Sequence, residues 1–339
     1  MKKRRDRVLA AVLAAILVLG LAGCGTMDDG KGKSEKKEAV KKDSYKIAIV
    51  PNSLNDPYMI MLSNAAKKQC DELGMEGVVQ STSSGSLTDV AGQTELIENI
   101  IANGTYDGIV VAAMSMDGIN VSVKACQDAG IPVVMMDNNA DQDALEKDGY
   151  ERIPFVGTDN YNAAAATGKW MKETYPEGTK LAKINGEEGN DNGNKRKKGI
   201  DDGLEGWCDV VAEQSTDWSV DEGYIAAQNI LMANPEVEVF WCACDAIGIG
   251  CVRALEEAGV LDKIDVIGFD GTVDGLELVK NGYEIANTAQ APDVMGREAI
   301  NVLIDVIEGG SPEMVTDSGY EIITKETAEE TIEKLKEYL

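Results

Sequence analysis

Short runs rich in β-branched and apolar residues alternate with longer segments of helical periodicity from Tyr45 onward. The runs form two sets, at 46–50, 77–81, 108–112, 132–136 and 154–157, and then at 180–185, 209–214, 237–242, 265–269 and 284–289. Strands that alternate with helices form parallel sheets covered by helices on both faces. Because the two sets have similar length and order, the pattern predicts an α/β protein of two doubly wound parallel-sheet lobes.

The segment after the first run shows the helical pattern clearly. Asp56 precedes Pro57, an arrangement typical of a helix N-cap followed by proline at the first helical position. One face of the following turns carries Met59, Leu62, Ala66, Cys70 and Leu73. These residues predict a helix that begins at Pro57.

The first 24 residues have the organisation of a bacterial export signal. Basic residues at 2–5 precede an apolar run at 8–21. This run has about 14 residues, fewer than the roughly 20 that a membrane-spanning helix needs, so it is typical of a cleaved secretory signal. It ends in Leu21-Ala22-Gly23-Cys24, which resembles the lipobox of bacterial lipoproteins.

The lipobox resemblance implies cleavage before Cys24 and attachment of lipid to its thiol. An ordinary signal peptide followed by an accidental cysteine is the alternative. We therefore expect residues 1–23 to be removed and residues 24–44, which are almost free of apolar side chains, to form a lipid anchor and flexible tether. The protein would be extracytoplasmic, held at the outer face of the cell membrane. At ~150 residues per domain, the part from Tyr45 onward has room for two domains.

The composition excludes several classes of function. A net charge of −27 repels phosphate backbones, so we expect no nucleic-acid binding. The chain has no histidine, which excludes Ser-His-Asp and Cys-His catalysis and histidine metal sites. Six cysteines follow Cys24 at spacings that fit no small disulfide scaffold, so we expect mostly free thiols.

Five motifs near the ends of predicted strands are similar to those of a known family. They are IVPNSLNDPYMIML (49–62), PVVMMDNNA (132–140), VGTDNYNA (156–163), VIGFDGTVDG (266–275) and NTAQAPDVMG (287–296). In order and spacing they resemble the periplasmic sugar-binding proteins of the ribose and galactose/glucose type, over about residues 45 to 325. The resemblance implies a type I periplasmic binding protein, whose two lobes are joined by three hinge strands and close over one monosaccharide.

The resemblance also implies the boundaries of the lobes and the partners of the protein. The first lobe would comprise 45–158 plus 291–317 and the second 159–290 plus 318–339, with crossings near 157–160, 290–291 and 316–320. The protein would be the monomeric solute-capturing subunit of an ABC importer and would deliver a monosaccharide or polyol to the permease subunits without a cofactor. The lactose-repressor family shares this core, but its DNA-binding helix pair would stand where this chain has a lipobox and tether.

In the first lobe, the resemblance assigns ligand contacts to four residues. Asp56 falls where the galactose/glucose type has a hydroxyl-binding aspartate, and Tyr58 where it has a stacking aromatic. Asp137 ends a predicted strand, where the family has an Asp or Asn that contacts sugar, and Asn138 follows it. The alternative for Asp56 is a plain N-cap, a role that can coexist with binding. The alternative for Asp137 is a turn residue.

In the second lobe, Asn190, Asn192 and Arg196 match positions where the galactose/glucose type has His, Asp and Arg. The two asparagines keep hydrogen-bonding capacity but lose charge, and this departure argues against glucose or galactose. Arg196 lies among lysines, so a solvated helix start is the alternative. Trp218, in STDWS, matches a second stacking aromatic, with a place in the core as the alternative.

Three further positions complete the implied site. Asp270 in GFDGT is the strongest single match, and Gln290 matches an amide that binds ligand at the hinge. Cys244 stands where both types have an asparagine, a clear departure because a thiol lacks the paired donor and acceptor of an amide. A buried strand cysteine is the alternative for Cys244.

These residue types suit a neutral sugar, since planar polar groups bind hydroxyls and aromatic rings cover C–H faces. Because such a ligand is uncharged, we expect a site with few net charges. The EF-hand spacing is absent near residues 176–182, so no metal site is predicted. We expect a binding protein and no enzyme. A sensor that presents its ligand to a membrane receptor or kinase is the alternative, and a glycoside hydrolase with facing Asp56 and Asp270 is a remote one.

Overall fold

The structure of the protein is a computed structural model that describes residues 42, 44–85 and 89–339. The predicted export signal, Cys24 and nearly all of the predicted tether lie outside these residues. Within the described part of the chain, no helix is long and apolar enough to cross a membrane.

Six parallel strands form the first sheet, in the order β11-β5-β4-β3-β1-β2. They are β1 (Lys46–Val50), β2 (Glu76–Val79), β3 (Gly108–Val111), β4 (Val133–Met136), β5 (Phe155–Gly157) and β11 (Val315–Asp317). Successive side chains of a strand point to opposite faces of a sheet. In β1, Ile47 and Ile49 enter one core, whereas Ala48 and Val50 enter another. This strand is therefore an unbroken apolar run because both of its faces are buried.

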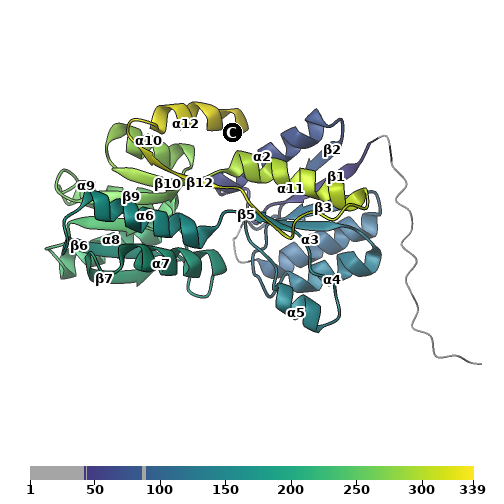
Figure 1. Cartoon of the computed structure of the whole chain (residues 1–339), viewed down its shortest axis with the longest axis horizontal. Helices are drawn as coiled ribbons and strands as arrows, with labels where there is room; N and C mark the ends of the chain where they lie inside the picture. Colours follow the sequence, from purple (N-terminus) through teal and green to yellow (C-terminus); the bar gives the residue numbers. More distant parts are fainter. Residues whose placement is uncertain (1–41, 43, 86–88) are drawn as a thin grey trace, which may run out of the picture. The chain divides into compact units, whose positions relative to one another are not determined.

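Helices cover both faces of this sheet (Figure 1). They are α2 (Pro57–Glu72) and α11 (Pro292–Ile307), which share the core of Ile47, and α3 (Val90–Asn103), α4 (Asn120–Ala129) and α5 (Gln142–Lys147), which share the core of Ala48. Helix α2 begins at Pro57 with Asp56 as N-cap, as predicted. The prediction for Leu73 is wrong: it follows the helix as the C-cap residue and is 45% exposed, where the chain turns away from the core.

The second sheet has the order β12-β10-β9-β8-β6-β7, in which β12 runs antiparallel to β10 and the other neighbours are parallel. Its strands are β6 (Lys180–Asn185), β7 (Asp209–Ser215), β8 (Val239–Cys242), β9 (Asp265–Asp270), β10 (Ala286–Gln290) and β12 (Tyr320–Thr324). The accompanying helices are α6 (Asn160–Thr174), α7 (Asp191–Leu204), α8 (Val220–Ala233), α9 (Asp245–Glu257), α10 (Val273–Asn281), α12 (Ala328–Leu335) and the 3₁₀ turn η1 (Lys336–Tyr338).

The predicted fold class, two α/β lobes with parallel sheets, is confirmed. All ten predicted strands are present, with ends within two residues of the prediction. The structure adds β11 and β12, which the sequence pattern did not reveal. β11 is an edge strand of three residues, and its Val315 is 63% exposed, so the strand lacks the apolar signal of a buried one.

The chain passes between the two sheets three times, after β5, after β10 and after β11. Two of these links are hydrogen-bonded to each other: the Ser318 amide donates to Gly157 O at 3.0 Å, and the hydroxyls of Thr158 and Ser318 lie 3.2 Å apart. These hydrogen bonds hold the link after β5 and the link after β11 next to each other.

Candidate ligand-binding site

A cavity of about 420 Å³ is lined by residues that follow the strands of both sheets. This volume lies in the range of small-molecule pockets, ~300–1,000 Å³. All eleven residues that the sequence assigned to a site line it: Asp56, Tyr58, Asp137, Asn138, Asn190, Asn192, Arg196, Trp218, Cys244, Asp270 and Gln290. The structure therefore brings the predicted residues together.

The sheet topology explains why these residues meet. In open α/β sheets, ligands bind beyond the carboxyl ends of the strands, where the strand order reverses. In the first sheet the reversal lies between β1 and β3, and in the second between β6 and β8. Asn52 and Ala113 follow the first pair, and Glu187 and Cys244 follow the second. The cavity thus takes its walls from the reversal points of both sheets.

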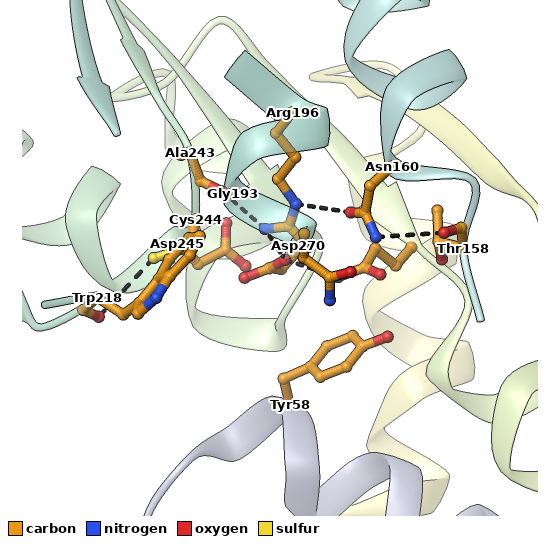
Figure 2. A network of polar contacts seen from close by, with 12 residues as sticks. Tyr58, Thr158, Asn160, Gly193, Arg196, Trp218, Ala243, Cys244, Asp245 and Asp270 are labelled. Atoms are coloured by element: carbon orange, nitrogen blue, oxygen red, sulfur yellow. Dashed lines mark hydrogen bonds and ion pairs between the residues drawn. The ribbon is translucent and has the colours of Figure 1, made fainter. Parts of the chain in front are cut away.

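Arg196 on α7 organises the second-lobe wall (Figure 2). Its Nε donates to Asn160 Oδ1 at 2.7 Å, and its Nη1 donates to Ala243 O at 2.7 Å and lies 2.8 Å from Asp270 Oδ1. The guanidinium carbon lies 4.0 Å from the centre of the Phe269 ring, within range of a cation–π interaction. Arg196 is only 4% exposed, so the alternative of a solvated helix start is wrong for this residue.

Asp270 is the partner that fixes this arginine. Its Oδ1 accepts a second hydrogen bond, from Gln290 Nε2 at 2.7 Å. Arg196 and Gln290 therefore both bind the same oxygen of Asp270. Burial raises the pKa of Asp270, while Arg196 and Gln290 act in the opposite direction. The Asp245 backbone also forms a hydrogen bond with the Asp270 carboxyl, and this contact lowers its pKa.

Two aromatic side chains contribute rings to the cavity. Trp218 follows β7, and its indole lies against Gly186 and Gly193: a Cβ on Gly186 would stand 2.1 Å from the ring. Only glycine leaves room for the indole there. Tyr58 on α2 is 3% exposed, and its hydroxyl donates to Met295 Sδ at 3.9 Å. In Figure 2, Tyr58 lies across from the Arg196 and Asp270 side chains.

Polar contacts cross between the lobes at Asn192 of α7. Its Nδ2 donates to Asn138 Oδ1 at 2.9 Å and to Asp137 O at 3.3 Å. The Asn138 amide in turn donates to Asp137 Oδ2 at 2.9 Å. The predicted turn residues after β4 and the predicted asparagine of the second lobe therefore form one short chain of hydrogen bonds.

Two of the predicted residues are also helix caps. Asp56 Oδ1 accepts from the Tyr58 amide at 2.9 Å, and Asn190 Oδ1 accepts from the Gly193 amide at 3.0 Å. Each capping bond uses one side-chain oxygen. Capping and a place in the cavity wall coexist at both positions.

Cys244 is buried, with 5% exposure, and its thiol donates to Trp218 O at 3.8 Å. Burial, followed by the charge of Asp270, raises its pKa well above the usual value, so the thiol is neutral. All six cysteines in the described residues are free thiols. Among those residues, no cluster of acidic and cysteine side chains could hold a metal ion.

The charge of the cavity differs from the expectation. Six acidic side chains and one basic side chain, Arg196, line it within the described residues. The acidic ones are Asp56, Asp137, Glu187, Asp245, Asp270 and Asp274. The prediction of few net charges is therefore wrong, because Asp245, Glu187 and Asp274 join the three carboxylates that the motifs identified.

Burial changes the protonation of these carboxyls. It raises the pKa of Asp137 to about 7, and burial together with the charge of Asp270 raises the pKa of Asp56 to about 6. The pKa of Asp245 rises to about 7 for the same two reasons. Asp245 accepts from the Thr272 amide and from Asn287 Nδ2, both at 2.6 Å.

Three of the four non-glycine residues with positive φ in the described chain lie in this site: Asp137 (φ 60°), Trp218 (φ 71°) and Asp270 (φ 104°). Aspartate tolerates the left-handed region, but a bulky residue such as tryptophan is an outlier there. Such backbone strain clusters at functional sites, since the surroundings must hold it in place. The three side chains are held in directions that relaxed backbone would not give them.

Sequence reasoning missed Asn52, which lines the cavity, is 7% exposed and has an Oδ1 without a partner among the described residues. Its signal was available: Asn52 follows β1, and the residues after strands were the ones expected to matter. Ser53, Met114 and Thr272 also line the wall.

Comparisons with known proteins agree with this architecture. Residues 47–311 match the family model described as the periplasmic binding protein domain, and the chain belongs to this family. It is 29% identical to the ribose import binding protein of Salmonella typhimurium, over 80% of this chain and 87% of that protein. It is also 29% identical to the D-allose-binding periplasmic protein of Escherichia coli strain K12, over 78% and 85%.

Solved structures give the same result. The crystal structure of an ABC transporter periplasmic solute binding protein from Actinobacillus succinogenes 130z, with bound D-allose, superposes with a TM-score of 0.80. It is 27% identical and covers 84% of this chain and 99% of its own. The fold of this chain is therefore that of an ABC transporter solute binding protein.

The buried carboxyls make a prediction about stability. A pKa raised on folding means that the folded state binds the proton more tightly, so the stability it contributes is present at low pH and is lost as pH rises through the folded pKa. For Asp137, whose pKa rises from 3.8 to about 7, the loss by pH 8 is roughly 4 kcal/mol. Thermal unfolding of ligand-free Asp137→Asn should therefore show a higher Tm than wild type at pH 8, and this advantage should shrink to less than half by pH 5 and vanish only below about pH 4, near the pKa of the unfolded state.

Exposed Asp262→Asn is the matched control, because it removes one carboxylate without removing a buried one. Its Tm should follow that of the wild type at every pH. Equal pH dependence for all three proteins would contradict a buried, destabilising Asp137 carboxylate.

Proposed function

We propose that the protein is an extracytoplasmic solute-binding protein that captures a monosaccharide or a related polyol and delivers it to the permease subunits of an ABC transporter. The observation that carries the proposal is the cavity, where polar side chains and two aromatic rings from both lobes converge in a member of the periplasmic binding protein family. The ribose-binding and allose-binding relatives support the class of ligand.

Capture requires the lobes to move. We propose that 45–158 plus 291–317 and 159–290 plus 318–339 are the two bodies, and that the joined links near Thr158 and Ser318 act as the hinge. The hydrogen bond from Asn192 to Asn138 joins the lobes at the wall of the cavity. In this scheme a ligand adds further bonds between the same walls and so favours the closed form, as any ligand that binds one state better must.

The side chains divide the recognition between them. Asp270, Asp137 and Asp56 accept hydrogen bonds from hydroxyls, and Arg196 orients Asp270. Asn190, Asn192 and Gln290 extend the polar rim, while the rings of Trp218 and Tyr58 face apolar C–H surfaces. Cys244 contributes a neutral wall rather than a nucleophile, because its thiol is protonated.

The proposed function also bears on catalysis, on the location of the protein and on the alternative functions. In this proposal no step of capture needs catalysis or a cofactor, so the protein acts as a binding protein and not as an enzyme, and one copy of the chain supplies the whole cavity. Lipid on Cys24 would hold it at the outer face of the membrane, beside the permease. A sensor for a membrane receptor would use the same closure, and a glycoside hydrolase would have to use Asp270, which Arg196 and Gln290 already engage.

The first test is a thermal-shift panel of about thirty sugars and polyols. A ligand at ~100 times its dissociation constant stabilises the folded state by about 2.7 kcal/mol, which gives a clear rise in Tm. Asp270→Asn should weaken binding of the selected ligand more than tenfold, since charge-assisted hydrogen bonds contribute ~1.5–3 kcal/mol. Asp262→Asn should bind like the wild type. No shift with any compound, or equal affinity in Asp270→Asn, would contradict the assignment.

The anchor is tested separately in cells. Cys24→Ser should move the protein from the membrane fraction to the soluble one, because the thiol that would carry the lipid is gone. Radiolabelled palmitate should label the wild type and not the variant. A variant that stays in the detergent phase would show that Cys24 is not the anchor.

A further inference from the structure

Several hydrogen-bond acceptors of the cavity have few or no partners among the described residues. Asn52 Oδ1 and Gln290 Oε1 are buried and have no partner within the described chain, although both residues line the cavity. Asp137 is 5% exposed, and its carboxylate accepts a single side-chain hydrogen bond, from Asn138. A carboxylate can accept about four hydrogen bonds. These atoms require a ligand that donates.

Several donors of the wall are already engaged. Arg196 gives its Nε and Nη1 to Asn160, Ala243 and Asp270. The amides of Asn138, Asn192 and Gln290 donate to Asp137, to Asn138 and to Asp270. Fewer of these donors are therefore available to a ligand.

Charge points in the same direction. Arg196 is paired with Asp270, and within the described residues no lysine or arginine forms an ion pair with Asp56 or Asp137. Buried charges without a partner are costly, so natural proteins pair them. Asp56 and Asp137 are thus cavity carboxyls without an ion-pair partner among the described residues, where a cation of the ligand could take that place, and no cluster suited to a metal ion is found there.

Resting on the function proposed above, we propose that the solute is a protonated amine, an amino sugar or amino-polyol, whose ammonium group is bound by Asp56 and Asp137. An ammonium has three donors and no acceptor, which matches the acceptor-rich wall. The faces of Trp218 and Tyr58 also attract a cation. The hydroxyls of the same ligand bind Asp270, Gln290 and Asn52.

A neutral ligand would bring no positive charge to compensate the carboxyls of the cavity. Asp56 and Asp137 could then bind protons instead, in the field of Asp270, Arg196 and Tyr58 that face them. The two cases differ in sign. An amine competes with protons and binds less tightly as pH falls from 7 to 5, whereas a neutral sugar favours the protonated cavity and binds equally or more tightly.

Calorimetric titrations with matched compounds decide between them. The probes are glucosamine, galactosamine, mannosamine and 1-deoxynojirimycin, each compared with its neutral parent sugar and, for the hexosamines, with the N-acetyl derivative. We expect at least one amine to bind more than tenfold tighter than its neutral counterpart at pH 7. Its affinity should fall at least tenfold at pH 5.

Variants locate the charge. Asp56→Asn and Asp137→Asn should each lower the preference for the amine over its neutral parent more than tenfold, while Asp262→Asn leaves that preference unchanged. Both variants keep an amide that can form hydrogen bonds in place of the carboxylate. Thermal unfolding of each variant shows whether it is folded. The pH dependence of the wild type tests the proposal without any variant.

The outcomes separate the two proposals. Neutral sugars that bind more tightly than every amine, with affinity unchanged or higher at pH 5, would overturn the cationic ligand and leave the sugar-binding function standing. Absence of binding to amines and to all neutral sugars and polyols of the panel would overturn both.

Discussion

The ion pair between Arg196 and Asp270 is the interaction on which the rest of the site depends. Both groups are nearly buried, and breaking a buried pair leaves an uncompensated charge that costs ~3–5 kcal/mol. Through its other donors Arg196 joins α6, by Asn160, to the end of β8, by Ala243. One guanidinium therefore fixes the second-lobe wall against which Asp270 and Gln290 take their positions.

Among the described residues, acidic side chains greatly outnumber basic ones in the wall of the cavity. With a single arginine for six acidic side chains, burial and mutual repulsion raise the pKa of Asp56 to about 6 and of Asp137 to about 7. Carboxyls with raised pKa values destabilise the protein in the absence of ligand, and they strengthen the binding of a ligand that compensates their charge. Stability given up at a binding site in this way is common in natural proteins.

Much of the fold could be predicted from the sequence because strands buried on both faces, such as KIAIV at β1, are unbroken apolar runs. The site could be located because the carboxyl ends of parallel strands meet at one edge of a sheet, which brings Cys244 and Asp270 together in the second sheet, while the same edge of the first sheet contributes Asp137. The exposed edge strand β11 gave no such signal.

What could not be predicted depends on long-range contacts. The sequence around Arg196 is rich in lysine, and only the packing of α7 shows that Arg196 turns inward while its neighbours Lys195 and Lys198 stay exposed. The charge of the cavity is likewise a sum over both lobes, so it was misjudged from the motifs alone. The roles of the eleven residues in ligand binding stay predictions.

Proton exchange on binding tests the central claim most directly, since it reports the charge that the carboxyls exchange for the ligand. The tightest compound is titrated at pH 6.5 in two buffers of different ionisation enthalpy, and the difference in heat gives the number of protons exchanged. An ammonium that replaces protons on Asp56 and Asp137 predicts net proton release, reduced in Asp137→Asn. Net proton uptake, or release that is unchanged in that variant, would contradict the account.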